Sequence, residues 1–187
     1  MHWPALVVGE DVNEVLAPFS TEIPVDPYFQ PLSADEQVQM SQFLRIPETD
    51  LPALCAKMPE WNGAQGLIQA GRLGWMSTVN PRGQYDWYRV GGQWTDFLHL
   101  LQPRRQRRLW GLLPGGWTSY ATKARKRDVD QTRLLDDPPE SLVIGTEWLE
   151  RRFPLTDETR QQWKAEFAER FRTIDDGALL TVVDLHS

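Results

Sequence analysis

Short apolar runs lie near both ends of the chain, and they constrain the fold more than any other feature. Residues 5–8 form a run that ends at Gly9, and residues 178–183 form a second run close to the C-terminus. Runs of this length and composition are typical of buried strands. Hairpin-like and helical patterns alternate between them. We therefore expect an α+β fold with an antiparallel or mixed sheet of about five to six strands, ferredoxin-like or related, and helices packed on one face.

Three further segments have helical patterns. Ser33 and Glu36 have the spacing of a capping box, which predicts a helix directly after them. The clearest helix follows Thr156, because large aromatic residues recur every four positions on one side. Apolar residues at helical spacing also predict a short helix over residues 94–101.

Two segments have the pattern of β-hairpins. Residues 75–79 and 85–90 have strand character and are separated by Asn-Pro-Arg-Gly, which is strong turn chemistry. Residues 142–144 and 147–150 flank a Gly-Thr pair in the same way. We expect each pair of segments to form two adjacent antiparallel strands.

Size and composition favour one domain over residues 1–187, interrupted by a basic, aromatic-rich loop segment at about 102–127. Cys55 is the one cysteine, so it has no partner for an internal disulfide. The N-terminal residues have neither the basic region nor the long apolar region of a signal peptide. No apolar run approaches the ~18 residues of a membrane helix. We expect a cytoplasmic protein without a membrane partner.

Charge is unevenly distributed along the sequence. The net charge is −6, yet no acidic residue occurs from Phe97 to Arg127. Basic residues interleaved with aromatic ones suit an acidic protein surface or a nucleoprotein complex, and they also suit phosphate contacts with base stacking. A solvated loop is the alternative. The candidate partner-binding residues are Arg104, Arg105, Arg107, Arg108, Trp110, Trp117, Lys123, Arg125, Lys126 and Arg127.

Chemistry-bearing residues are densest between positions 80 and 94. Asp86 is a candidate base, Arg89 a candidate anion clamp, and the Gly91-Gly92 pair permits a sharp turn or close approach of a ligand to the backbone. The same residues would also suit a packed hairpin in which the glycines allow close packing. Both interpretations stay open from the sequence.

Three more candidate catalytic residues lie at the ends of the terminal strands. Glu10 follows the first strand, and Asp184 and His186 end the last one on the same face. An Asp-x-His pair can orient an imidazole, whereas helix capping and a polar strand end are the alternatives. With three histidines, of which His2 is expected to be mobile, we expect no metal site and no cofactor.

Three segments together resemble a family of mostly uncharacterised phage and phage-derived bacterial proteins. They are Val7-Val-Gly-Glu-Asp-Val12 running on to Leu16-Ala-Pro-Phe19, then Asn80-Pro with Asp86-Trp-Tyr88 and Gly91-Gly-Gln-Trp94, and finally Thr181-Val-Val-Asp-Leu-His186. The chain departs from the family at Tyr85, where Trp is common, and at Gln93, where Arg is common. The resemblance implies a setting in phage or mobile-element biology, in the cytoplasm of a bacterial host.

The leading hypothesis from the sequence is a non-enzymatic accessory protein that binds a macromolecule. In the setting that the resemblance implies, such proteins include inhibitors of host defence systems such as CRISPR complexes. The first alternative is a small nucleotide-binding or hydrolytic enzyme with its site around Asp86, Arg89 and the glycine pair, which requires the strand ends at Asp86 and His186 to converge. The second is direct nucleic-acid binding through the basic segment. The oligomeric state is left open.

Overall fold

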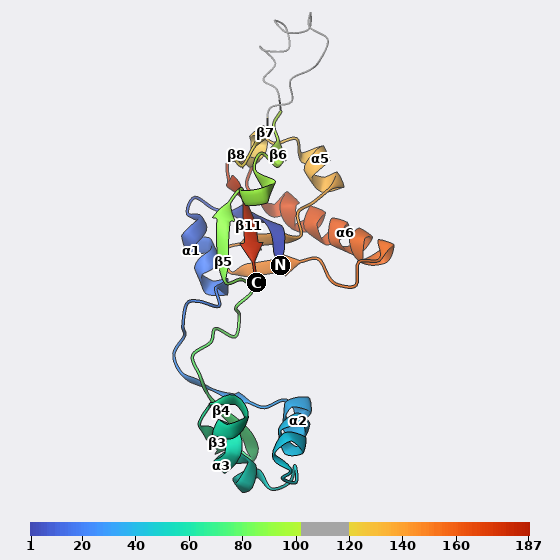
Figure 1. The fold of residues 1–187 in the computed structure, drawn as a ribbon. Coiled ribbons are helices and arrows are strands. Elements are labelled where there is room, and N and C mark those ends of the chain that lie inside the picture. The colour runs from blue at the N-terminus through green and yellow to red at the C-terminus, as the bar shows by residue number, and fades with distance from the viewer. Residues whose placement is uncertain (102–119) are drawn as a thin grey trace, which may run out of the picture. The chain divides into compact units, whose positions relative to one another are not determined.

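A computed structural model describes residues 1–101 and 120–187, which group into two compact units (Figure 1). The larger unit comprises residues 1–22 and 81–187, and the smaller comprises residues 23–80. The sequence indicated one domain, because neither boundary at 22/23 or 80/81 is marked by a low-complexity linker. The candidate catalytic residues all belong to the larger unit.

The larger unit is built on a mixed sheet of six strands with the order β10-β9-β1-β11-β5, and β8 also pairs with β11. The strands are β1 (His2–Val8), β5 (Trp87–Val90), β8 (Lys123–Arg125), β9 (Ser141–Ile144), β10 (Glu147–Glu150) and β11 (Leu179–His186), with β6 (Leu98–His99) and β7 (Tyr120–Ala121) as a separate pair. The two terminal strands pair antiparallel, while β1 and β9 run parallel. The predicted α+β class and mixed sheet are confirmed.

One edge of β11 is shared by two short strands. β8 pairs with the beginning of β11 and β5 with its end, so both lie along the edge that β1 does not occupy. The chain passes from β5 into a short 3₁₀ helix, Gly92–Trp94, at the point where the two partners meet. The end of β11 therefore has β1 on one side and β5 on the other.

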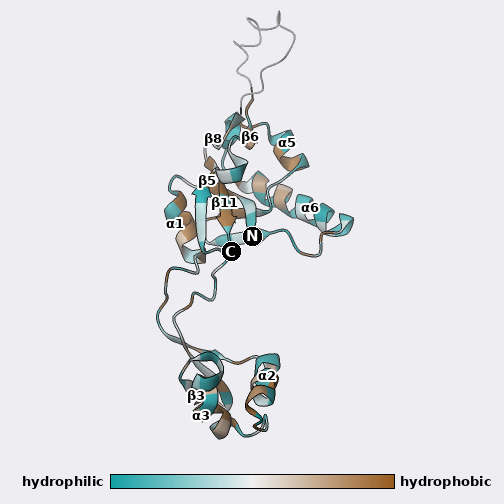
Figure 2. Ribbon diagram, viewed as in Figure 1, coloured by the Kyte–Doolittle hydropathy of each residue, from teal (hydrophilic) through white to brown (hydrophobic). Residues whose placement is uncertain are grey.

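Helices cover both faces of this sheet, which corrects the expectation that they pack on one face. Figure 1 shows α1 (Val12–Leu16) on the opposite side of the sheet from α6 (Asp157–Thr173). α5 (Gln131–Asp136) lies with α6 in the same apolar cluster. The physical reason is that β11 is apolar on both faces: Val182 belongs to the cluster with Phe167 of α6, and Val183 to the cluster with Leu16 of α1. Figure 2 shows β11 coloured as hydrophobic accordingly.

The smaller unit pairs a three-stranded antiparallel sheet with two helices. Its sheet has the order β2-β4-β3. The elements are β2 (Tyr28–Pro31), α2 (Ala34–Leu44), α3 (Leu51–Asn62), β3 (Gly66–Gln69) and β4 (Arg72–Ser77). The predicted capping box opens α2, because the Ser33 hydroxyl accepts from the Glu36 N–H and the Glu36 carboxylate accepts from the Ser33 N–H. The unit has its own buried core of Leu32, Met40, Leu54, Met58 and Leu73.

The predicted hairpin of residues 75–79 and 85–90 is wrong. β4 pairs with β2 and β3 of the smaller unit, whereas β5 pairs with β11 of the larger unit. The Asn-Pro-Arg-Gly segment between them holds the boundary between the units. The hairpin of β9 and β10, with Gly145 at a φ of +56°, is confirmed.

The helix predicted over residues 94–101 is also absent from the described part of the chain. The 3₁₀ helix Gly92–Trp94 is followed by Asp96 at a φ of 61°, and β6 then begins at Leu98. The Asp96 N–H donates to the Thr122 hydroxyl at 3.0 Å, a long-range contact that local spacing does not encode. Within residues 1–101 and 120–187, no helix is long and apolar enough to cross a membrane.

Candidate acid–base site

Two carboxylate–imidazole pairs lie together at one end of the main sheet. His186 Nδ1 lies 2.9 Å from Asp86 Oδ1, and His2 Nδ1 lies 3.0 Å from Asp184 Oδ1. The two imidazole rings contact each other edge to face, with centroids 4.9 Å apart and an interplanar angle of 67°. We call these four side chains, together with the adjacent Trp87 and Arg89, the dyad cluster.

Strand alternation and register account for this arrangement. Leu6 of β1 lies opposite Val182 of β11, and both face the α6 side of the sheet. Every second residue of a strand lies on the same face, so Asp184 and then His186 follow Val182 on this face of β11. His2 of β1 lies opposite His186. The apolar face under α6 thus continues into a polar end, where β1 and β11 supply three of the four paired groups.

β5 adds two side chains to this face. Trp87 lies opposite His186 in the register, and Arg89 lies opposite Asp184. The indole of Trp87 stacks on the His186 ring with centroids 5.0 Å apart and an angle of 15°, and it meets His2 edge to face at 5.4 Å. Arg89 is exposed and makes no ion pair with any residue within the described ranges.

The glycine pair closes the backbone over Asp184. Gly91 and Gly92 have φ values of +72° and +54°, and a Cβ atom on Gly92 would stand 2.3 Å from the Cβ of Asp184. Asp184 is 3% exposed, and its Oδ2 accepts from the Gln93 N–H at 3.2 Å. Oδ1 is left for His2, so the carboxylate is fixed from two sides. The sequence left open whether the glycines allow a ligand to approach the backbone or allow close packing. In the structure, Gly92 packs closely against Asp184.

Asp86 stands at the start of β5 and is held in place by backbone contacts. Its N–H donates to the His186 carbonyl at 2.9 Å, and its Oδ1 accepts from the Trp87 N–H at 2.8 Å. Partial desolvation works against ionisation, but the hydrogen bonds from His186 and Trp87 outweigh it and lower the pKa of Asp86. An ionised Asp86 accepts the proton on His186 Nδ1, which leaves Nε2 of that ring as the outer nitrogen.

Sequence reasoning located part of this site and missed the rest. Asp86 and His186 converge as the enzyme hypothesis required, and Asp184 and Arg89 join them. His2 was missed, since it was expected to be mobile. The signal that would have found it is the antiparallel pairing of the two terminal apolar runs, which sets His2 opposite His186.

Glu10 does not belong to the dyad cluster. Its carboxylate pairs with Arg125, whose guanidinium also donates to the Gly177 carbonyl at 2.9 Å. Lys126 is 4% exposed, and its ammonium lies 2.5 Å from the Ile174 carbonyl. Lys126 is therefore used inside the protein, whereas Arg125 is paired within the chain but keeps 38% of its side chain exposed. The sequence had suggested that both cations are presented at the surface.

The remaining predicted partner-binding residues fall into two groups. Lys123 and Arg127 are exposed. The others lie outside the described residues: Arg104, Arg105, Arg107, Arg108, Trp110 and Trp117.

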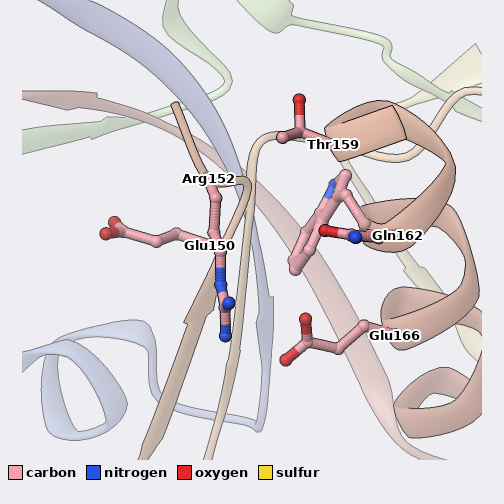
Figure 3. A pocket seen from close by; sticks show the side chains of 6 residues that line it. Glu150, Arg152, Thr159, Gln162 and Glu166 are labelled. Atoms are coloured by element: carbon pink, nitrogen blue, oxygen red, sulfur yellow. The ribbon is translucent and has the colours of Figure 1, made fainter. Parts of the chain in front are cut away.

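A separate hollow of about 280 Å³ lies between β10 and α6 (Figure 3). It is lined by Glu150, Arg152, Thr159, Gln162, Trp163 and Glu166. Figure 3 shows Arg152 and Glu166 extending toward it from opposite sides. The polar side chains around it are largely exposed. Trp163 is buried, and its indole N–H donates to the Pro139 carbonyl at 2.9 Å. The hollow offers charged groups but no paired acid and base.

Comparison of the chain with protein-family models, with curated proteins and with solved structures finds no match.

Within the described residues, no group of three or more His, Cys, Asp or Glu side chains is placed to hold a metal ion. Two adjacent imidazoles, each with a carboxylate on Nδ1, can accept and donate a proton in one reaction.

Proposed function

We propose that the protein is an acid–base enzyme that cleaves ester or phosphoester bonds at the dyad cluster. The observation that carries the proposal is the contact between the His2 and His186 rings, each paired through Nδ1 with its own carboxylate. Two pairs in contact supply both a base and an acid to the same substrate.

The reaction follows from the free ring nitrogens. The Nε2 atoms of His2 and His186 make no hydrogen bond with any described residue. One neutral imidazole takes a proton from water or a hydroxyl group, whose oxygen then forms a bond to the carbonyl carbon or phosphorus. The other, protonated imidazole gives its proton to the leaving oxygen as the bond between that oxygen and the carbonyl carbon or phosphorus breaks. Asp86 and Asp184 orient the rings through their Nδ1 atoms.

The test uses two chromogenic probes, p-nitrophenyl acetate and bis(p-nitrophenyl) phosphate. The protein should hydrolyse at least one of them, with a pH–rate profile that falls at both acidic and basic limits, because one imidazole must be neutral and the other protonated. His186→Gln and His2→Gln should each lower kcat/KM by about 10²- to 10⁴-fold.

The matched control is His99→Gln. His99 lies in β6, where its ring contacts Tyr120 and its Nδ1 lies 2.9 Å from an Arg133 nitrogen, outside the dyad cluster. This variant should keep wild-type turnover. Absence of turnover of both probes would contradict the proposal, as would wild-type turnover in the His2→Gln/His186→Gln double variant.

A second candidate function is the binding of a macromolecule by a phage-type accessory protein, including inhibition of a host defence complex. The observation that favours it is the exposure of Lys123 and Arg127 in the segment without acidic residues. The test compares the proteins that wild type and Lys123→Glu/Arg127→Glu retain from a bacterial lysate. A partner lost in the variant supports the candidate, and an identical set of retained proteins contradicts it.

A further inference from the structure

The exposed ring of Trp87 points to the kind of substrate that the dyad cluster takes. Trp87 is 45% exposed, although one of its faces is stacked on His186. Its indole N–H has no hydrogen-bond partner within residues 1–101 and 120–187. Trp163 is a contrast, since its ring is buried and its N–H is bonded. An open indole beside the two imidazoles is a stacking platform for a flat ring.

Arg89 supplies a positive charge at a fixed distance from that platform. It lies two residues along β5 from Trp87 and on the same face, so their backbone positions are about 7 Å apart. Asp184, which lies opposite Arg89, is already bonded to His2 and to the Gln93 N–H. The guanidinium is therefore available to a ligand, and its planar donors suit phosphate oxygens.

A ligand with a flat ring and a phosphate a few ångströms away is a nucleotide. Resting on the proposed function, we infer that the dyad cluster cleaves single-stranded RNA, with a base stacked on Trp87 and a phosphate bound by Arg89. Single strands are required because a base must be unstacked to reach the indole. Since the chain carries a net charge of −6, we expect modest affinity that depends on salt.

The 2′-hydroxyl of RNA serves as the nucleophile. One imidazole takes the 2′-hydroxyl proton, and the 2′-oxygen forms a bond to phosphorus. The bond from phosphorus to the 5′-oxygen breaks, and the other imidazole gives that oxygen a proton. The products are a 2′,3′-cyclic phosphate and a 5′-hydroxyl end, and no oxidant or further reactant is consumed.

The binding test uses a 2′-O-methyl oligouridylate, which lacks the nucleophile and therefore stays intact. Trp87→Ala should weaken its binding by about 10- to 100-fold, because a stacked base is lost. Arg89→Gln should lower the slope of log affinity against log salt by about 0.7, the value for one phosphate contact on a single strand. The matched controls are Tyr120→Ala, an exposed ring elsewhere in the larger unit, and Arg172→Gln, an exposed cation of α6. Both should bind as wild type does.

The cleavage test compares an RNA oligonucleotide with the DNA oligonucleotide of the same sequence. We expect cleavage of the RNA alone, with cyclic phosphate ends that mass spectrometry detects. Equal cleavage of the DNA, or unchanged binding by Trp87→Ala, would overturn the inference. If the chromogenic esters are hydrolysed while RNA is neither bound nor cleaved, the inference fails and the acid–base function stands. If no substrate is turned over, both fail.

Discussion

Gly92 lies directly against Asp184, so closely that a Cβ atom added to the glycine would stand 2.3 Å from the aspartate Cβ and 2.4 Å from its Oδ2. This contact links the main chain after β5 to the carboxylate that orients His2. It also explains why a residue without a side chain is needed there, beyond its positive φ. The packing of the Gly92–Trp94 turn thus sets the geometry of one half of the dyad cluster.

Gly92→Ala should therefore lower the free energy of unfolding by more than the positive φ at this position alone would cause. Gly145→Ala is the matched control, because Gly145 has a φ of +56° against +54° at Gly92 but has no atom within 4 Å of the added Cβ. We expect about 1–2 kcal/mol for Gly145→Ala and at least about 3 kcal/mol for Gly92→Ala. Urea denaturation measures both, and equal losses would contradict the contact.

Acid should weaken the larger unit through Asp86. Because its folded-state pKa lies below the ordinary value of 3.8, Asp86 adds stability that is fully present above that value. The contribution is lost as the pH falls through the folded-state pKa. Asp86→Asn should flatten the dependence of the urea midpoint on pH below about pH 4. Parallel curves for wild type and variant would show that Asp86 has no such role.

Lys126 should stabilise the folded protein rather than bind a partner. Its ammonium bonds the Ile174 carbonyl, lies 5.1 Å from the centre of the Phe171 ring and is 3.3 Å from a carboxylate oxygen of Asp176. Lys126→Met keeps much of the apolar stem and leaves the buried carbonyl without its donor, which should cost about 1.5–3 kcal/mol. The exposed Arg127→Ala should cost less than about 0.5 kcal/mol. Thermal unfolding compares the two, and similar small losses would contradict the buried contact.

The smaller unit should lose stability on its own when its core is damaged. Leu54 is fully buried among side chains that all belong to residues 23–80, so Leu54→Ala should cost about 2–5 kcal/mol within that unit. Hydrogen exchange of the β4 amides should accelerate, while the amides of β1 and β11 keep their protection. Leu142→Ala, in the core of the larger unit, should give the reverse pattern. Equal loss of protection in both units would contradict the division.

Local signals in the sequence predict many of the elements but not which strands pair. The capping box at Ser33, the helix after Thr156 and the turn at Gly145 depend on neighbouring residues, and all three are confirmed. Residues 75–90 also have clear strand and turn patterns, yet β4 pairs with β2 in the smaller unit and β5 pairs with β11 in the larger unit. Strand pairing of this kind is decided by contacts far apart in the sequence.

The candidate site shows the same limit. Asp86, Arg89, Asp184 and His186 were selected from residue type and strand position, whereas His2 enters through the register of β1 against β11. Arg125 and Lys126 looked like part of an exposed basic segment, because a charge run is ordinarily solvated. Their partners, Glu10 and the Ile174 carbonyl, lie 115 and 48 positions away, so the sequence around them carries no sign of these contacts.

The central claim is that each carboxylate holds the proton on Nδ1 of its histidine and leaves Nε2 open for chemistry. Long-range ¹⁵N NMR spectra of the ring nitrogens measure this directly at neutral pH, and His2→Gln and His186→Gln assign the signals. We predict that the neutral forms of His2 and His186 both carry the proton on Nδ1, with an unprotonated Nε2. A proton on Nε2 in the neutral form of either ring would contradict the account, since that nitrogen could not then act as the base.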